Sequence, residues 1–155
     1  MKLLRSMLLS VLMSFAYIVP AAWAAELPSS PQQPQASLYQ RLGGYDALAA
    51  VSDDFLGHLA NDPQMGRFFV GLSTDSRNKV RQHVVDFLCV ATGGPCKYTG
   101  RDMKTAHTGL NITESDWTSM VKYLVGTLDK FKVPEKEKNE VLSALSGLKG
   151  DIVGR

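Results

Sequence analysis

Apolar residues recur at three- and four-residue intervals along most of the chain after residue 36, which is the spacing of one helix face. The pattern predicts helices over 37–42, 45–60, 74–91, 113–131 and 134–152, with short helical pieces after Pro63 and over 103–107. Glycine pairs at 43–44 and 93–94 mark chain turns between them. No alternation of apolar and polar residues is long enough to require a sheet, so the predicted fold class is all-α.

Polar residues at the expected helix starts match the preferences of N-caps. Ser37 can cap the first turn, and either Thr74 or Asp75 can cap the helix over 74–91. Thr113 with Asp116 resembles an N-cap pattern in which the carboxylate also suits the positive helix end. Pro134 fits a first helical position, so a single helix is expected from there to 152.

The first 24 residues have the three parts of a secretory signal peptide. Lys2 and Arg5 form a basic start, 8–19 is mostly apolar and uncharged, and Ala22-Trp23-Ala24 offers small residues for cleavage after Ala24. An uncleaved membrane anchor is the alternative, but the apolar run is shorter than the about 20 residues that span a bilayer. We therefore expect an exported protein, periplasmic or secreted, without stable membrane insertion once the signal is removed.

The composition of the remaining chain indicates a linker followed by one domain, and its charge balance narrows the classes of partner. Residues 25–36 are rich in Pro, Gln and Ser and are expected to form a disordered linker, followed by one domain over 37–153. Loss of Lys2 and Arg5 leaves 15 basic against 15 acidic residues, and this balance argues against nucleic acid or an anionic membrane as partner.

The two cysteines, Cys89 and Cys96, flank the glycine corner at 93–94. An oxidising compartment would permit them to form a disulfide, which we prefer because export is expected. Two free thiols are the alternative, and thiol titration with and without reductant decides between them.

The three histidines are the candidate metal ligands. His58 lies beside the apolar stripe of its helix and is expected at the surface. His107 shares a helical face with Met103, which alone is a weak indication of a ligand. His83 projects from an apolar stripe with Val80, Val84, Phe87 and Leu88, where a buried structural histidine is the simpler explanation. Two such histidines on different helices could nevertheless bind the two faces of a flat metallocycle.

Other chemistries lack their motifs in this sequence. There is no HExxH or CxxC for zinc, and GGPCKYTG lacks the lysine followed by serine or threonine that ends a phosphate loop. No CxxCH motif is present for standard covalent haem attachment.

Several linked segments resemble the group 1 truncated haemoglobins, in order and at nearly the same spacing over 37–153. The segments are SLYQRLGGYDAL, DDFL, LANDPQMGRFF, FLCVATGGPCKYTGRDMKTAH and GLNIT. The resemblance implies a two-over-two helical sandwich around haem b, with O2, NO or CO as small ligands.

The same resemblance assigns roles to individual residues. It implies that His107 is the proximal iron ligand, that Phe69 wedges against the porphyrin, and that Phe87 and Met103 pack on it. His83 matches a position where some members carry a second iron-binding histidine. The positions that usually govern bound ligands are Leu56, Val80 and Val84, and a haem propionate is expected near Lys79 or Arg77.

The chain departs from the family's common distal pattern, in which tyrosine and glutamines hydrogen-bond the ligand. Leu56, Val80 and Val84 have no donor, so only the side chain of His83 can stabilise a bound gas. We therefore expect reversible gas binding with His83 as a switchable ligand. Nitric oxide dioxygenation with an unknown reductase, and electron transfer, are the alternatives.

Overall fold

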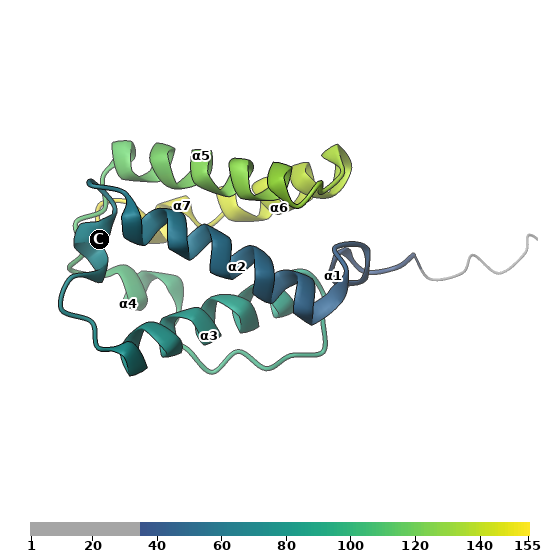
Figure 1. The fold of residues 1–155 in the computed structure, drawn as a ribbon, viewed down its shortest axis with the longest axis horizontal. Coiled ribbons are helices and arrows are strands. Elements are labelled where there is room, and N and C mark those ends of the chain that lie inside the picture. The colour runs from purple at the N-terminus through teal and green to yellow at the C-terminus, as the bar shows by residue number, and fades with distance from the viewer. Residues whose placement is uncertain (1–34) are drawn as a thin grey trace, which may run out of the picture. The chain divides into compact units, whose positions relative to one another are not determined.

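A computed structural model describes residues 35–155, and every regular element in that range is helical. The elements are α1 (Leu38–Arg41), α2 (Gly44–Asn61), the 3-10 helix η1 (Gly66–Phe69), α3 (Thr74–Ala91), α4 (Met103–His107), α5 (Glu114–Lys130), α6 (Glu135–Ser146) and α7 (Lys149–Ile152). The predicted all-α class is confirmed (Figure 1). The signal peptide and most of the linker fall outside the described residues. None of the helices within 35–155 is long and apolar enough to cross a bilayer.

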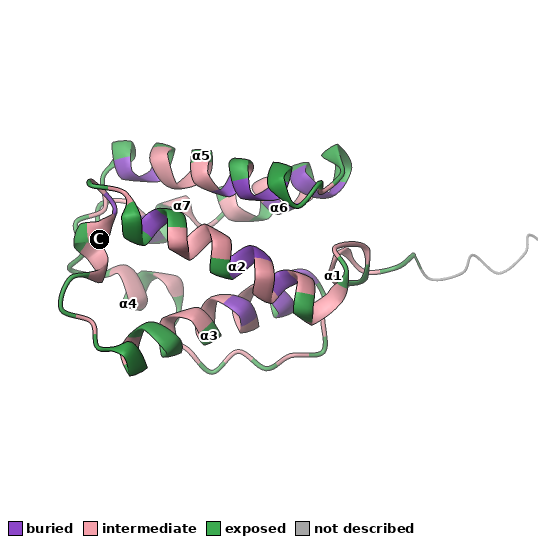
Figure 2. Ribbon diagram, viewed as in Figure 1, coloured by how far each residue is buried: buried purple, intermediate pink, exposed green. Residues whose placement is uncertain are grey.

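The buried core lies where α2 packs against α5 and α6. Its centre consists of Val51 from α2, Leu124 and Leu128 from α5, and Val141 from α6. Leu124 and Leu128 are one helical turn apart, so they lie on the same face of α5. Figure 2 shows the buried segments on these helices, whereas much of α3 and α4 is only half-buried. The core that holds the domain together is therefore distinct from the surface that α3 and α4 provide.

Two glycines are required where α1 meets its neighbours. Gly43 has a φ of +96°, which side-chain-bearing residues rarely adopt, and it forms the turn between α1 and α2. Gly94 is needed for close packing, because a Cβ there would lie 2.6 Å from both Cys89 Sγ and Tyr39 Cδ2. The glycine pairs predicted as turns are thus confirmed, and the second of them lets the chain pass closely beneath α1.

The helix caps agree with the sequence at two sites and differ at two others. Ser37 and Thr113 are N-caps, as predicted, and each forms a capping box. The cap of α3 is Ser73, one residue before the predicted Thr74, because its side chain accepts the backbone N–H of Ser76. Pro134 precedes α6 as its N-cap in extended conformation, so the first helical residue is Glu135.

The single helix predicted over 134–152 is wrong, because the chain forms α6 and α7 with a turn between them. The break occurs at Gly147 and Leu148. There the backbone N–H of Leu148 donates to the carbonyl of Leu145, a tighter turn than the α-helical bond four residues back. The apolar period runs on through the turn, which is why the sequence pattern concealed it.

Candidate functional site

His107 ends α4, and the local hydrogen bonds fix which of its ring nitrogens is available. Asp102 caps this helix by accepting the backbone N–H of Thr105 at 2.8 Å. The Nδ1 atom of His107 lies 2.7 Å from the carbonyl oxygen of Met103. Because a carbonyl can only accept, Nδ1 carries the proton in this bond, so in the neutral imidazole Nε2 is the nitrogen that has the free lone pair. The half-buried ring therefore offers Nε2 as a metal ligand.

The helix α3 has two apolar faces with different degrees of burial. Val85 and Cys89 are fully buried against the rest of the domain. Val80, Val84 and Phe87, at helical spacing on another face, are only half-buried. The predicted stripe was therefore correct as a pattern, but the sequence analysis did not identify Val85 as a fully buried residue of the helix. A half-buried apolar face is the surface that a large flat apolar group can cover.

His83 lies on that half-buried side of α3 and has an unsatisfied nitrogen. Its Nδ1 atom is buried and has no hydrogen-bond partner among residues 35–155. Buried polar atoms are nearly always paired in folded proteins, so an unpaired one marks a position that a ligand or a ring rotation can satisfy. The edge of Tyr98 packs against the imidazole with 6.0 Å between ring centroids. The same tyrosine also packs edge-on against Phe87, with 5.5 Å between the two ring centroids.

Tyr98 is a site residue that the sequence analysis did not identify. Its hydroxyl donates to the carbonyl of Arg101 at 2.6 Å, which orients the ring in the loop between α3 and α4. Burial, assisted by Asp102, raises the pKa of this phenol. The available indication was an aromatic residue placed two positions after Cys96, in the segment that leads to His107.

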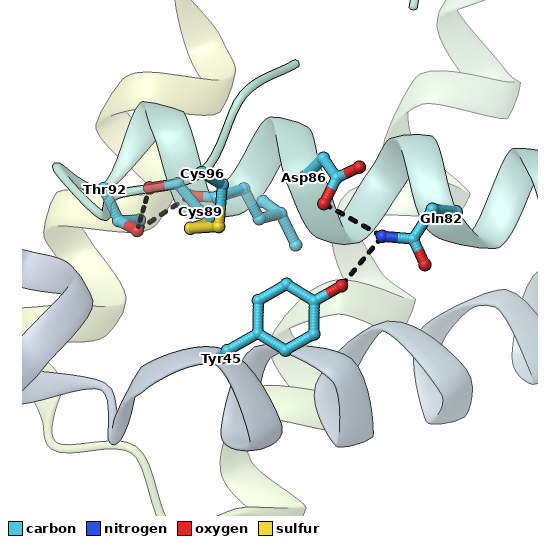
Figure 3. Close-up of a disulfide and its surroundings, with 7 residues drawn as sticks. Tyr45, Gln82, Asp86, Cys89, Thr92 and Cys96 are labelled. Atoms are coloured by element: carbon cyan, nitrogen blue, oxygen red, sulfur yellow. Dashed lines mark hydrogen bonds between the residues drawn. A yellow bond between two sulfur atoms is a disulfide. The ribbon is translucent and has the colours of Figure 1, made fainter. Parts of the chain in front are cut away.

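A disulfide joins this loop to α3 (Figure 3). The sulfur atoms of Cys89 and Cys96 are bonded, and their Cα atoms lie 5.8 Å apart. Two helical turns before Cys89 on α3, the side chain of Gln82 donates to the hydroxyl of Tyr45 on α2 and to Asp86. The loop that carries Tyr98 is thus covalently attached to the helix that carries His83.

Three of the residues expected around the ligand line a single cavity. Leu56 of α2, Phe69 of η1 and Val80 of α3 contribute to a cavity of about 230 Å³. Its remaining lining residues are Asp53, Gly57, Ala60, Arg77, Asn78 and Arg81. Lys79, the other residue expected near a propionate, is exposed and does not line this cavity.

An anchoring network that the sequence analysis missed holds η1, and with it Phe69. The buried carboxylate of Asp116 accepts from Arg67 Nη2 at 2.6 Å and from Gln64 Nε2 at 2.6 Å. It also accepts the backbone and hydroxyl donors of Thr113. Burial alone would raise the pKa of Asp116, but these donors outweigh it and hold that pKa well below its usual range. Only the cap between Thr113 and Asp116 was visible in the sequence.

His58 is exposed at the surface, as predicted, with half of its side chain accessible. Its ring stacks on Tyr123 at 5.6 Å between centroids. The hydroxyl of Tyr123 in turn donates to Asp62 at 2.5 Å. This histidine therefore packs on the surface between α2 and α5.

The residues present fit a haem group on three observations. His107 has Nδ1 bonded to a carbonyl and Nε2 left for a ligand, His83 has a buried nitrogen without a partner among residues 35–155, and both helices offer half-buried apolar side chains. A neutral imidazole and an apolar cradle are what a protein needs to hold an iron porphyrin without covalent attachment.

Comparison with known proteins identifies the family. The model of the bacterial-like globin family matches residues 37–153. The group 1 truncated hemoglobin GlbN of Mycolicibacterium paratuberculosis is 34% identical over 117 residues, covering 76% of this chain and 84% of that protein. The corresponding protein of a Nostoc species is 30% identical and covers 77% and 98% of the two chains.

Solved structures agree in fold. The Fe(III) form of the Tetrahymena pyriformis truncated hemoglobin superposes with a TM-score of 0.70 at 28% identity, covering 77% of this chain and all of that one. The 2/2 hemoglobin of a Synechococcus species, in the cyanomet state with covalently attached heme, gives 0.70 at 30% identity with the same coverage. The predicted two-over-two architecture is thereby confirmed. The chain belongs to the bacterial-like globin family, as a group 1 truncated haemoglobin that binds small gas ligands through haem.

Proposed function

We propose that this protein binds a diatomic gas reversibly at haem iron, with His107 as the fixed proximal ligand and His83 as an exchangeable distal one. When bound, haem supplies an iron atom that can take one protein nitrogen on one face and a gas or second nitrogen on the other. The observation that carries the proposal is the 2.7 Å contact between Nδ1 of His107 and the Met103 carbonyl. It fixes the imidazole orientation and tautomer, as such contacts do for metal-ligating histidines.

The distal assignment rests on the unpaired nitrogen of His83 and on the side chains around it. Leu56, Val80 and Val84 carry no hydrogen-bond donor, so a bound gas has only His83 as a side-chain partner among the expected distal residues. Because Nδ1 of His83 has no partner in the part of the chain that the structure describes, no hydrogen bond to that nitrogen from these residues has to break when the ring moves. We expect His83 to occupy the iron when no gas is present and to leave it when gas binds.

Absorption spectra of the purified protein test both assignments. The ferric and ferrous wild-type proteins should give six-coordinate bis-histidine spectra. His83→Ala should convert these to spectra with one histidine, and should raise the rate of CO binding because no internal ligand has to dissociate. His107→Ala should lose haem or bind it only weakly, with recovery on added imidazole.

His58→Ala is the matched control, since it removes the remaining histidine from the exposed side of α2. Its spectra should equal those of the wild type. A bis-histidine spectrum that persists in His83→Ala would contradict the distal assignment. A His107→Ala protein with unchanged haem affinity and spectra would contradict the proximal one.

We also propose that the haem is haem b, held without covalent bonds, and that the protein is exported with cleavage after Ala24. The Cys89–Cys96 disulfide supports export, because such bonds persist in oxidising compartments. Extraction into acidified organic solvent should remove all of the haem. Mass spectrometry of the protein from the periplasmic fraction should give an N-terminus at Ala25, whereas an intact N-terminus in the cytoplasmic fraction would refute export.

A further inference from the structure

We propose that Gly154 and Arg155 are positioning residues for His107, because together with α7 they hold the short helix that carries this histidine. The inference rests on the proposed function, in which His107 binds the iron. It adds a support for the proximal ligand that comes from a segment far later in the sequence.

The helix α4 is too short to fix the position of His107 alone. It comprises the five residues Met103–His107, and helices of that length are unstable in isolation because few hydrogen bonds offset the ordering of the backbone. Asp102 caps the start of this helix, but His107 is at its other end, and the next residues, 108–110, are exposed. The position of the imidazole therefore depends on what packs against α4.

Within residues 35–155, α7 is the helix that packs most extensively on α4. The last residue of α7, Ile152, is buried, which anchors this helix in the domain. Lys149, at its start, forms an ion pair with Glu114 in the first turn of α5, at 2.7 Å. An exposed ion pair contributes little free energy, so burial of Ile152 is the main hold on α7.

Two backbone hydrogen bonds join the segment after α4 to the segment after α7. The N–H of Asn111 donates to the carbonyl of Arg155 at 3.0 Å, and the N–H of Gly154 donates to the carbonyl of Ile112 at 2.9 Å. The side chain of Arg155 also donates from Nε and Nη2 to the carbonyl of Gly150, at 3.0 and 2.7 Å, and so closes the turn after α7. We call α7 with these two residues, Gly154 and Arg155, the proximal clamp.

Gly154 allows a substitution that loosens the proximal clamp locally. Its φ is +72°, which side-chain-bearing residues rarely adopt, although a Cβ there would meet no atom of residues 35–155 within 4 Å. Alanine would therefore strain the backbone without a steric clash. Gly71, between η1 and α3, is the matched control, because its φ is +79° and a Cβ there has equally free space. Both substitutions should cost the fold a similar free energy, but only Gly154→Ala changes the clamp.

Hydrogen exchange followed by mass spectrometry tests the clamp without a readout from the iron. In the ferric protein, peptides covering 103–112 should exchange about tenfold faster in Gly154→Ala, the factor expected if the left-handed strain of one residue falls on these hydrogen bonds. Arg155→Met removes the bonds to Gly150 and should also accelerate exchange. Its side chain is exposed, so this variant keeps the test available if Gly154→Ala does not fold. Gly71→Ala should leave these peptides within about twofold of the wild type.

Resonance Raman spectra of the ferrous proteins test whether the clamp acts on the imidazole itself. The variants are made in the His83→Ala background, so that His107 is the protein ligand under observation. A ring held in one orientation gives a narrow iron–histidine stretching band, whereas a ring that samples several orientations gives a broad one. Gly154→Ala and Arg155→Met should broaden this band. Gly71→Ala should leave it unchanged, because a loss of overall stability alone does not reorient the ring.

The outcomes separate the clamp from the proposed function. If His83→Ala shows the iron–histidine band and Gly154→Ala behaves as Gly71→Ala does in both experiments, the clamp is refuted and the ligand assignment stands. Faster exchange without a broader band also refutes the inference, because α7 would then support the helix and not the position of its histidine. If His83→Ala shows no iron–histidine band, or if His107→Ala retains it, the proposed function fails instead.

Discussion

Replacement of Asp116 by asparagine should destabilise the domain, because this carboxylate joins the start of α5 to η1. The side chain is fully buried and accepts four hydrogen bonds, from Arg67, Gln64 and two donors of Thr113. Asparagine has a single acceptor oxygen, and its NH2 group would face donors. Removing one partner of a buried pair costs 3 to 5 kcal/mol, and we expect about 3 kcal/mol because Arg67 is half-exposed and can turn to water.

Urea denaturation of the ferric protein, followed by far-UV circular dichroism, measures this change as a lower midpoint with an unchanged slope. In thermal unfolding it corresponds to a decrease of about 10 °C for a domain of this size. Glu114→Gln is the matched control, since Glu114 is in the first turn of the same helix but its side chain is 70% exposed and pairs with Lys149. It should cost less than about 1 kcal/mol.

The pH dependence gives a second test of the same carboxylate. Its pKa is depressed in the folded protein, whereas in the unfolded chain it is about 3.9. Above that value both states are ionised and the stabilisation is complete. Below it the unfolded chain binds the proton first, so the stabilisation declines as the pH falls toward the folded pKa. The difference in the free energy of unfolding between wild type and Asp116→Asn should therefore become smaller below about pH 4. If Asp116→Asn lowers the free energy of unfolding no more than Glu114→Gln does, the buried carboxylate does not stabilise the fold as stated. The same holds if its effect does not change with pH.

Three further changes have defined outcomes. Reduction of the disulfide, or replacement of Cys89 and Cys96 by serine, should lower the free energy of unfolding by about 2.5 kcal/mol, measured in urea with and without reductant. Gly43→Ala should cost about 1 to 2 kcal/mol in the same assay, because alanine is strained at a φ of +96°. Tyr123→Phe should raise the pKa of Asp62 toward its ordinary value, since the tyrosine hydrogen bond is the largest cause of its depression, and a carboxyl ¹³C NMR titration should detect the rise.

Local features of the fold could be predicted from the sequence, and contacts between distant segments could not. The cap of α5 was visible because Thr113 and Asp116 are three residues apart, and the helical period alone predicted α4. The hydrogen bond between Asp116 and Arg67 joins residues 49 positions apart, so it cannot be predicted from helical periodicity. The same reason concealed the pair of Arg81 with Asp53.

The faces of α3 illustrate a different limit. A helical stripe shows that certain residues share a side, but not how deeply that side is buried. Val85 lies next to Val84 in the sequence and is completely buried, while Val84 is half-buried, because different elements pack on the two sides. Hydrophobicity is the same for both residues, so only the packing of α3 against its neighbours separates them.

The separation between the core and the distal residues also affects how this protein can change over evolutionary time. Val51, Leu124, Leu128 and Val141 hold the domain together, and none of the expected distal residues belongs to that cluster. A substitution at a distal position therefore leaves the folding core intact and acts mainly on the gas. Single substitutions at these positions can change the preference for one gas over another at small cost in folding stability. Such changes therefore do not require earlier stabilising substitutions.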